Sequence, residues 1–582
     1  MKQTSTFPYQ DQSLSVEQRV EDLLSRLPLE AKAGLMFHPI GTVGDLDEPG
    51  RFRPITTRQL MDSQIRHMNV LMAPSARELA AWNNTLQEEA LSHPLGIPVT
   101  ISTDPRHSFT DNPAMSMFAG PFSQWPEPLG LGAIGSEDLV RRFADTVRQE
   151  YLAVGIRTSL HPQIDLATEP RWSRQMGTLG EDAALTSRLG VAYVLGLQGD
   201  EIGPTSVSAM AKHFPGGGPQ KDGEDPHFAY GREQVYPGGQ FDLHLEPFKA
   251  VIAAGVSQLM PYYGMPVDTK LEEVGFSFNK QVITGLLREQ LGYDGIVCSD
   301  WGILSHTYWG VEDLSFEQRM VKAIDAGIDQ FGGETDVESL ISLIRSGAIS
   351  EARIDVSARR LLREKFRLGL FDDPFVDVER SELLVGTEHA RAEGLAAQAA
   401  AHTLLKNAPD GPAHLPLREG LKVYLQNVEP EHLSARATVV STPEEADLAI
   451  LRFAAPWEQR GVPGEYESFF HAGSIAYPAE EIDRIRSIAA KVPTIANVYL
   501  DRPAILAEIS EAVASLMANF GASDEAFARI LFGEAEPQGR LPFDIPSSME
   551  AVEKSRPDVP FDTDSPTYRC GFSLSYESEP SA

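Results

Sequence analysis

Residues 295–302 read GIVCSDWG, a short apolar run that starts at a glycine and ends in Ser299, Asp300 and Trp301. Apolar runs of this length bounded by glycine are typical of buried strands, so the pattern predicts a strand over 295–299. An aspartate at the end of such a strand either caps the following helix or carries a function. These eight residues leave both interpretations open.

The alternation of apolar strand and amphipathic helix continues from about residue 97 through the first part of the chain. The predicted strands are IPVTIS, GIRTSLH, SVSAMA, VSQLMPY, GIVCS and GIDQF. In the predicted helix over 136–154, apolar residues recur every four positions on one face: Leu139, Phe143, Val147 and Tyr151. Such alternation predicts a parallel sheet, either open or closed into a barrel.

Polar side chains follow the ends of five predicted strands. They are Asp104, Asp165, Lys212 with His213, Tyr262 with Tyr263, and Asp300. In a (β/α)8 barrel the carboxyl ends of the strands converge on one pocket. The sequence therefore favours an α/β fold with a TIM-like (β/α)8 barrel, and it favours a functional Asp300 over a capping one.

A second, smaller α/β region follows the predicted barrel. The stretch FDDPFVDVER is rich in aspartate and proline, as is typical of a linker. Beyond it, LKVYLQ, ADLAILRF, TIANVYL and AVASLMANF are typical of strands, with helical stretches between them. We predict a catalytic barrel domain over 1–375, a linker over 376–385, and an α/β sandwich domain over 386–582.

Charge narrows the classes of function. The 582 residues include 50 Lys and Arg against 83 Asp and Glu, a formal net charge of −33. So acidic a surface repels nucleic acid and anionic membranes, and we expect a neutral small molecule as the substrate. The sequence has neither the apolar run of about 18 residues that a membrane span needs nor a signal-peptide core. We therefore expect a cytoplasmic protein and leave a homo-oligomer open.

Common cofactor and metal motifs are absent from the sequence. The glycine motif GLGAIG over 130–135 follows no predicted strand, so it does not predict a dinucleotide site. The histidines lack metal-ligand spacing, and the esterase motif G-x-S-x-G does not occur. We expect neither a metal nor a cofactor, which leaves the chemistry to carboxylates.

Seven motifs, in order along most of the chain, resemble those of the family 3 glycoside hydrolases, especially their two-domain exo-acting β-glucosidases. They are RVEDLLSRLPLEAKAGLM, LGIPVTISTD, EPRWSRQMGTLGED, AKHFPGGG, GYDGIVCSDWG, GRLPFDIP and YRCGFSLSY. The resemblance implies a retaining exo-β-glycosidase that removes terminal β-D-glucose from small β-glycosides or short oligosaccharides. In that mechanism one carboxylate attacks the anomeric carbon and a second group protonates the leaving oxygen.

The resemblance also implies roles for individual residues. Asp300 would be the nucleophile, and Trp301 would stack against the sugar beyond the scissile bond. The acid/base would be a glutamate on a loop of the second domain. Three glutamates are candidates, and the residue order of APWEQR resembles the family loops that carry this acid, so Glu458 is chosen over Glu465 and Glu467. The residues implied to hold the sugar are Asp104, Arg174, Lys212, His213 and Tyr263.

Other functions stay open. An N-acetylglucosaminidase of the same family would use a histidine after KHFPG as acid/base, and Asp225 and His227 in KDGEDPHF have suitable spacing. Those relatives, however, usually carry another histidine where Gly217 stands. A β-xylosidase and a phosphorylase or transglycosylase variant also remain as alternatives. The intact nucleophile and sugar-binding residues argue against a catalytically silent sugar-binding protein.

Overall fold

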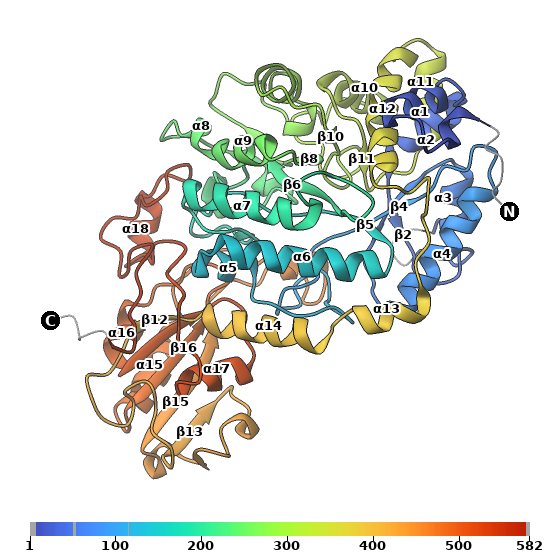
Figure 1. The fold of residues 1–582 in the computed structure, drawn as a ribbon. Helices are drawn as coiled ribbons and strands as arrows, with labels where there is room; N and C mark the ends of the chain where they lie inside the picture. Colours follow the sequence, from blue (N-terminus) through green and yellow to red (C-terminus); the bar gives the residue numbers. More distant parts are fainter. Residues whose placement is uncertain (1–6, 51–53, 114–115, 578–582) are drawn as a thin grey trace.

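The computed structural model describes residues 7–50, 54–113 and 116–577 and shows two α/β parts (Figure 1). The first part contains a seven-stranded sheet in which every neighbouring pair is parallel. Its strands, in sheet order, are β10 (Ile296–Val297), β8 (Gln258–Pro261), β6 (Ser208–Phe214), β5 (Ile156–Ser159), β4 (Thr100–Thr103), β3 (His67–Val70) and β2 (Ile40–Gly41).

Two further strand pairs accompany this sheet. The strand β1 (Phe37–His38) pairs in parallel with β11 (Phe331–Gly332), and β7 (Glu233–Gln234) pairs with β9 (Met265–Pro266). Cys298, directly after β10, also forms an isolated parallel bridge to Gln330, directly before β11. The strand ladder therefore continues from β10 toward β11 and β1.

Helices connect the strands of the first part and cover their outer side (Figure 1). They are α1 (Val16–Leu24), α2 (Leu29–Leu35), α3 (Thr57–Asp62), α4 (Ala76–Ser92), α5 (Pro128–Ile134), α6 (Glu137–Ala153), α7 (Ala183–Gln198), α8 (Phe241–His244), α9 (Glu246–Ala253), the π-helix η6 (Gln281–Gln290), α10 (Phe316–Ala326), α11 (Val337–Arg345) and α12 (Glu351–Arg367). In α6, the Ser136 side chain accepts the Leu139 N–H and caps the first turn. Phe143, Val147 and Tyr151 are buried, as their spacing predicts.

The strand β3 was not predicted from the sequence. It reads HMNV, so polar residues interrupt the apolar run by which a buried strand is recognised. His67 and Asn69 are nevertheless buried. Asn69 can lie inside because its amide donates to Asp104 and its side-chain oxygen accepts the Ser102 hydroxyl.

The second part contains a six-stranded sheet with helices on both faces. In sheet order its strands are β12 (Thr403–Lys406), β17 (Ser515–Asn519), β16 (Thr494–Tyr499), β15 (Leu448–Ala454), β13 (Lys422–Gln426) and β14 (Thr438–Val440), and only β12 is antiparallel to its neighbour. Its helices, with those that precede it, are α13 (Val378–Leu384), α14 (Glu388–Ala400), α15 (Ala479–Ala489), α16 (Ala507–Ala512), α17 (Asp524–Leu531) and α18 (Met549–Lys554).

Alternate residues of the central strands face two separate apolar cores. Ala449 and Leu451 of β15 belong to the core that includes Ile485 of α15. Leu448 and Ile450 belong to the opposite core, which α17 helps to form. A sheet buried on both faces needs apolar residues at successive positions, which explains the continuous run that predicts this strand.

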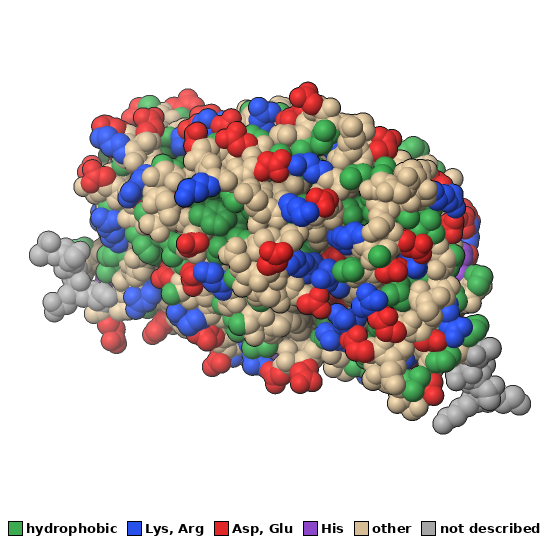
Figure 2. Space-filling model, turned by 90° about the horizontal axis from the view of Figure 1, so that it is seen from above, with side chains coloured by type: hydrophobic (Ala, Val, Ile, Leu, Met, Phe, Trp, Pro, Cys, Tyr) green, Lys and Arg blue, Asp and Glu red, His purple; other side chains and the backbone are tan. Residues whose placement is uncertain are grey.

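The predicted boundaries, 1–375, 376–385 and 386–582, stay a prediction. The helix α13 lies within the predicted linker and packs against α4 and α6. Among the described residues, no helix combines the length and the apolarity that a membrane crossing requires. Figure 2 shows acidic and basic side chains interspersed over the face seen from above.

Hydrogen bonds from backbone N–H groups to carboxylates join the two parts. Glu181, in the first part, accepts the backbone N–H groups of Asp544 (2.7 Å) and Phe561 (2.8 Å). In the opposite direction, the Asp558 carboxylate accepts the N–H groups of Gly238 and Gln240, each at 2.8 Å. These contacts hold the C-terminal segment against the loops of the first part.

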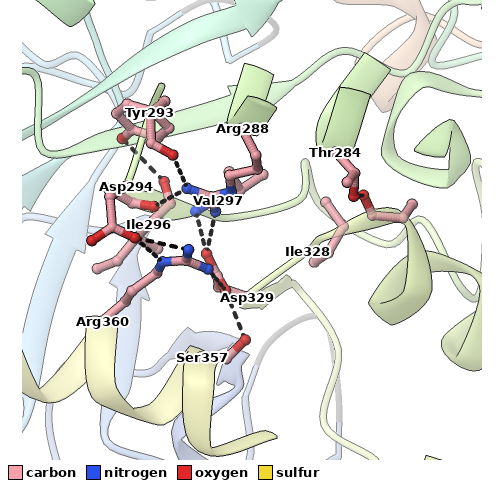
Figure 3. Close-up of polar contacts among 12 residues, drawn as sticks. Thr284, Arg288, Tyr293, Asp294, Ile296, Val297, Ile328, Asp329, Ser357 and Arg360 are labelled. Atoms are coloured by element: carbon pink, nitrogen blue, oxygen red, sulfur yellow. Dashed lines mark hydrogen bonds and ion pairs between the residues drawn. The ribbon is translucent and has the colours of Figure 1, made fainter. Parts of the chain in front are cut away.

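A polar network surrounds Asp329, which precedes β11, whereas Asp300 follows β10 (Figure 3 shows the network). The Asp329 side chain is 0% exposed, and its carboxylate accepts hydrogen bonds from Arg288 (2.6 Å), Val297 N (3.0 Å), Ser357 (2.7 Å) and Arg360 (3.1 Å). One carboxylate therefore ties η6, β10 and α12 together. Two guanidinium groups compensate its buried charge.

Replacing Asp329 by alanine should lower the free energy of unfolding by about 3 kcal/mol, because it removes the fully buried carboxylate that Arg288 and Arg360, 12% and 15% exposed, share. The matched control is Asp294→Ala, which removes a 69% exposed carboxylate from the same Arg360 and should cost only about 0–1 kcal/mol. Chemical denaturation of both variants measures the difference. Equal losses of stability in the two variants would contradict the role of the Asp329 carboxylate in holding η6, β10 and α12 together.

Glu127 lies at the contact between the two parts. Its backbone N–H donates to Phe520 O at 2.9 Å, and its carboxylate accepts the Thr110 N–H at 3.0 Å. The Tyr499 hydroxyl, at the end of β16, lies 3.5 Å from the same carboxylate oxygen. Burial raises the pKa of Glu127 to about 7.

This raised pKa predicts a pH-dependent stability. An unfolded glutamate releases its proton near pH 4.3, whereas the folded chain retains it to about pH 7, so stability falls as the pH rises through this window. Glutamine cannot ionise, so it does not lose stability in this window. The melting temperature of Glu127→Gln minus that of wild type should therefore increase from pH 5 to pH 8. The exposed Glu480→Gln is the control. A constant difference across the window would contradict the prediction.

Candidate active site

The predicted strand ends meet at the carboxyl edge of the first sheet. Asp104 follows β4, and Lys212 lies near the end of β6. The Lys212 ammonium lies 3.5 Å from Asp104 Oδ1, while Asn69 donates to Asp104 Oδ2 at 3.0 Å. Burial lowers the pKa of Lys212, and the charge of Asp104 opposes that effect. The pair presents an ammonium donor beside a carboxylate acceptor, an arrangement that suits neighbouring hydroxyl groups of a sugar.

Asp300 follows the β10 strand after Cys298 and Ser299 and is 8% exposed. Its Oδ1 accepts the Trp301 backbone N–H at 2.8 Å. Its Oδ2 lies 3.8 Å from His213 Nε2 and accepts no hydrogen bond from any described residue. One oxygen therefore orients the carboxylate, whereas the other is buried without a hydrogen-bond partner among the described residues.

His213 lies next to this oxygen, and Arg174 contacts His213. Arg174 Nη1 lies 3.1 Å from His213 Nε2, and both side chains are buried. On its other side, His213 Nδ1 contacts the buried Asp165 carboxylate at 2.7 Å. From the sequence, Asp165 is a strand-end residue without an assigned role; in the structure it lies behind His213.

Trp301 and Tyr263 form an aromatic wall beside Asp300. The Tyr263 hydroxyl donates to Trp301 O at 2.7 Å. The half-buried Trp301 ring packs on the backbone at Gly332, where an added Cβ would lie 2.6 Å from the ring. Only glycine permits this approach, so the position of the indole depends on Gly332.

A loop between β15 and α15 of the second part reaches this site. The Tyr466 ring, half exposed, has its centroid 5.9 Å from that of His227 and 5.2 Å from that of Phe470. Partial burial raises the pKa of the Tyr466 hydroxyl, and the charge of Arg174 opposes that effect. No local motif marks Tyr466, because its proximity depends on how the two parts pack.

Hydrogen bonds fasten this loop to the first part. Tyr230 donates to the Glu467 carboxylate at 2.7 Å, and Asn112 donates to Phe469 O at 3.2 Å. Arg460 pairs with Glu224. The loop therefore has a defined position above the strand ends.

The two sequence-derived acid/base candidates occupy different surroundings. Glu458 is exposed, and its carboxylate accepts the Ser474 N–H at 3.1 Å. Among the described residues, neither a hydrogen bond nor an ion pair joins Glu458 to Asp300. His227, by contrast, is held by Asp225 at 2.6 Å, and its ring centroid lies 4.7 Å from that of Tyr263.

Comparison with known families agrees with this architecture. Residues 59–364 match the glycosyl hydrolase family 3 N-terminal domain, and residues 305–576 match the glycosyl hydrolase family 3 C-terminal domain. The chain belongs to glycosyl hydrolase family 3. The resemblance identified from the seven sequence motifs is thereby confirmed.

Family 3 relatives match nearly the whole chain. It is 49% identical to Beta-glucosidase C of Emericella nidulans, over 98% of this chain and 94% of the relative. It is 39% identical to the Periplasmic beta-glucosidase/beta-xylosidase of Dickeya chrysanthemi, over 97% of this chain and 91% of the relative.

Solved structures share the fold. The Listeria innocua beta-glucosidase in complex with isofagomine has a TM-score of 0.77 at 22% identity, covering 96% of this chain and 83% of that one. The Q683A mutant of the exo-1,3/1,4-beta-glucanase from a Pseudoalteromonas species has a TM-score of 0.79 at 21% identity, covering 99% of both chains.

Replacing Gly332 by alanine should displace Trp301, because the new Cβ would lie 2.6 Å from both the indole ring and the Ser299 carbonyl oxygen. Overpacking of this kind costs about 1–3 kcal/mol. Chemical denaturation measures the loss, and tryptophan fluorescence reports the displaced indole. Gly203→Ala is the control, since its Cβ would meet nothing within 4 Å. Unchanged fluorescence and stability in Gly332→Ala would contradict the close approach.

Proposed function

We propose that this chain is a retaining exo-β-glycosidase that hydrolyses terminal β-D-glucosides. The observation that carries the proposal is the Asp300 carboxylate, with one oxygen held by Trp301 N and the other left free. A nucleophile needs this combination of fixed orientation and an available lone pair. The relatives named as β-glucosidases support glucose as the terminal sugar.

In the proposed mechanism, Asp300 Oδ2 attacks the anomeric carbon while the bond to the leaving oxygen breaks. The acid/base donates a proton to that oxygen, then removes one from the water that hydrolyses the glycosyl-enzyme. Arg174 and Lys212 offer donors to the sugar hydroxyls, and Asp104 accepts from them. Tyr263 and Trp301 provide the aromatic wall. The two steps restore Asp300 and need neither metal nor cofactor.

The acid/base has two candidates. Glu458 remains the assignment from the sequence motif, on the second-domain loop. The contacts favour His227, because Asp225 orients its Nδ1 and its ring lies beside both Tyr263 and Tyr466. An imidazole held by a carboxylate can donate and accept the proton that each step requires.

The deciding experiment measures hydrolysis of nitrophenyl β-glucoside, β-xyloside and N-acetyl-β-glucosaminide by wild type, Glu458→Ala and His227→Ala. Loss of the acid/base should slow turnover by about 10²–10⁴-fold, and azide should restore it while forming a β-glycosyl azide. We expect rescue in His227→Ala, a preference for the glucoside, and no turnover by Asp300→Asn.

Glu465→Ala is the control on the same loop and should keep wild-type activity. Rescue in Glu458→Ala instead would return the role to the sequence-based assignment. A preference for the acetamido sugar, or a wild type inactive on all three substrates, would contradict the glucosidase. Phosphate-dependent formation of a sugar phosphate would identify a phosphorylase. The β-xyloside is included because one relative is named as both a β-glucosidase and a β-xylosidase.

We also propose that the first sheet closes into a TIM-like (β/α)8 barrel. The β1–β11 pair and the bridge between Cys298 and Gln330 support this closure, because β1 leads directly into β2 at the other edge. Treating β1 and β2 as one interrupted strand gives the eight positions of such a barrel. The cytoplasmic location, the possible homo-oligomer and the absence of nucleic-acid and membrane partners stay predictions from composition.

A further inference from the structure

Asp165 is 0% exposed, and its two carboxylate oxygens have different partners. Oδ1 accepts two backbone N–H groups, those of His213 at 3.1 Å and Gly217 at 2.6 Å. Oδ2 contacts His213 Nδ1 at 2.7 Å. Burial acts to raise the pKa of Asp165, and the hydrogen bonds from His213 and from the two backbone N–H groups act to lower it. Because Oδ1 already accepts two N–H groups, it carries no proton.

The partners of His213 determine where its proton lies. An arginine only donates, so Nε2, at 3.1 Å from Arg174 Nη1, must present its lone pair. The single proton of the neutral ring therefore lies on Nδ1, which donates it to Asp165 Oδ2 at 2.7 Å. The Asp165 carboxylate then accepts at both of its oxygens. Burial and the charge of Arg174 both lower the pKa of His213, in agreement with a neutral ring.

We propose that Asp165 is a positioning residue that holds His213 in this tautomer, so that His213 aims Arg174 at the sugar and leaves Asp300 Oδ2 free. The inference rests on the proposed function for the roles of Arg174 and Asp300. The tautomer of His213 matters for Asp300 because His213 Nε2 lies only 3.8 Å from Asp300 Oδ2. A proton on Nε2 would oppose the Arg174 donor and would be directed to the oxygen that attacks.

Asp165→Asn tests this inference with almost no change of shape. Because Oδ1 already accepts two backbone N–H groups, the new amide nitrogen has to take the place of Oδ2. That nitrogen is a donor facing Nδ1, so the imidazole proton must move to Nε2. We expect a loss in kcat/KM on nitrophenyl β-glucoside of about 100-fold or more, as when a catalytic imidazole is held in the wrong tautomer.

The matched control is Glu150→Gln, which alters another buried carboxylate bonded to a histidine. Glu150 contacts His107 at 2.9 Å and lies outside the proposed site. This variant should lower the melting temperature, and the folded enzyme should keep kcat/KM within about threefold. A loss confined to Asp165→Asn therefore cannot come from the removal of a buried charge alone.

Two further readouts separate positioning from a structural role. Nitrogen-15 NMR of histidine-labelled enzyme, assigned by the signal missing in His213→Asn, should show the proton on Nδ1 in wild type and on Nε2 in Asp165→Asn. In kinetics, adding Asp165→Asn to His213→Asn should cause little further loss, because Asp165 acts through His213.

The inference is overturned if Asp165→Asn retains activity within threefold, if its His213 proton stays on Nδ1, or if the two losses add. The tautomer is measured on the free enzyme and does not depend on turnover. A wild type that hydrolyses no glycoside but shows the predicted tautomer would defeat the proposed function and leave the structural assignment of His213 intact.

Discussion

Parallel pairing of β4, β5, β6, β8 and β10 is the constraint on which the rest of the structure depends. Parallel strands present their carboxyl ends at one edge, so the residues that follow them gather in one place. The close approach of Asp104 to Lys212, and of His213 to Asp300, follows from this pairing. The Asp329 network precedes a strand, β11, whereas the candidate site residues lie at or follow the strand ends.

The Asp329 and Asp300 carboxylates differ in how many of their oxygens accept hydrogen bonds. The Asp329 carboxylate is saturated by two guanidinium groups, a hydroxyl and a backbone N–H. In Asp300, one carboxylate oxygen has no hydrogen-bond partner among the described residues. A buried polar atom without a partner costs free energy that folding alone does not explain.

The second part completes the site from above the strand ends. Its loop carries Tyr466 toward His227, and Arg460, Glu467 and Asn112 take part in the contacts that hold the loop in place. Buried carboxylates such as Glu181 and Asp558 bind backbone N–H groups across the contact. The position of the loop over the strand ends therefore follows from interactions between the parts rather than from the loop sequence.

The sequence by itself determined the two-domain α/β organisation and the residues at the strand ends, because buried strands require apolar runs and each motif is local. It did not reveal β3, where Asn69 is buried only because Asp104 and Ser102 satisfy its amide. It gave Asp165 no role, and it could not place Glu458 and His227 relative to Asp300. Only the tertiary structure decided those relations, because hydrogen bonds between residues far apart in the chain have no signature in local spacing.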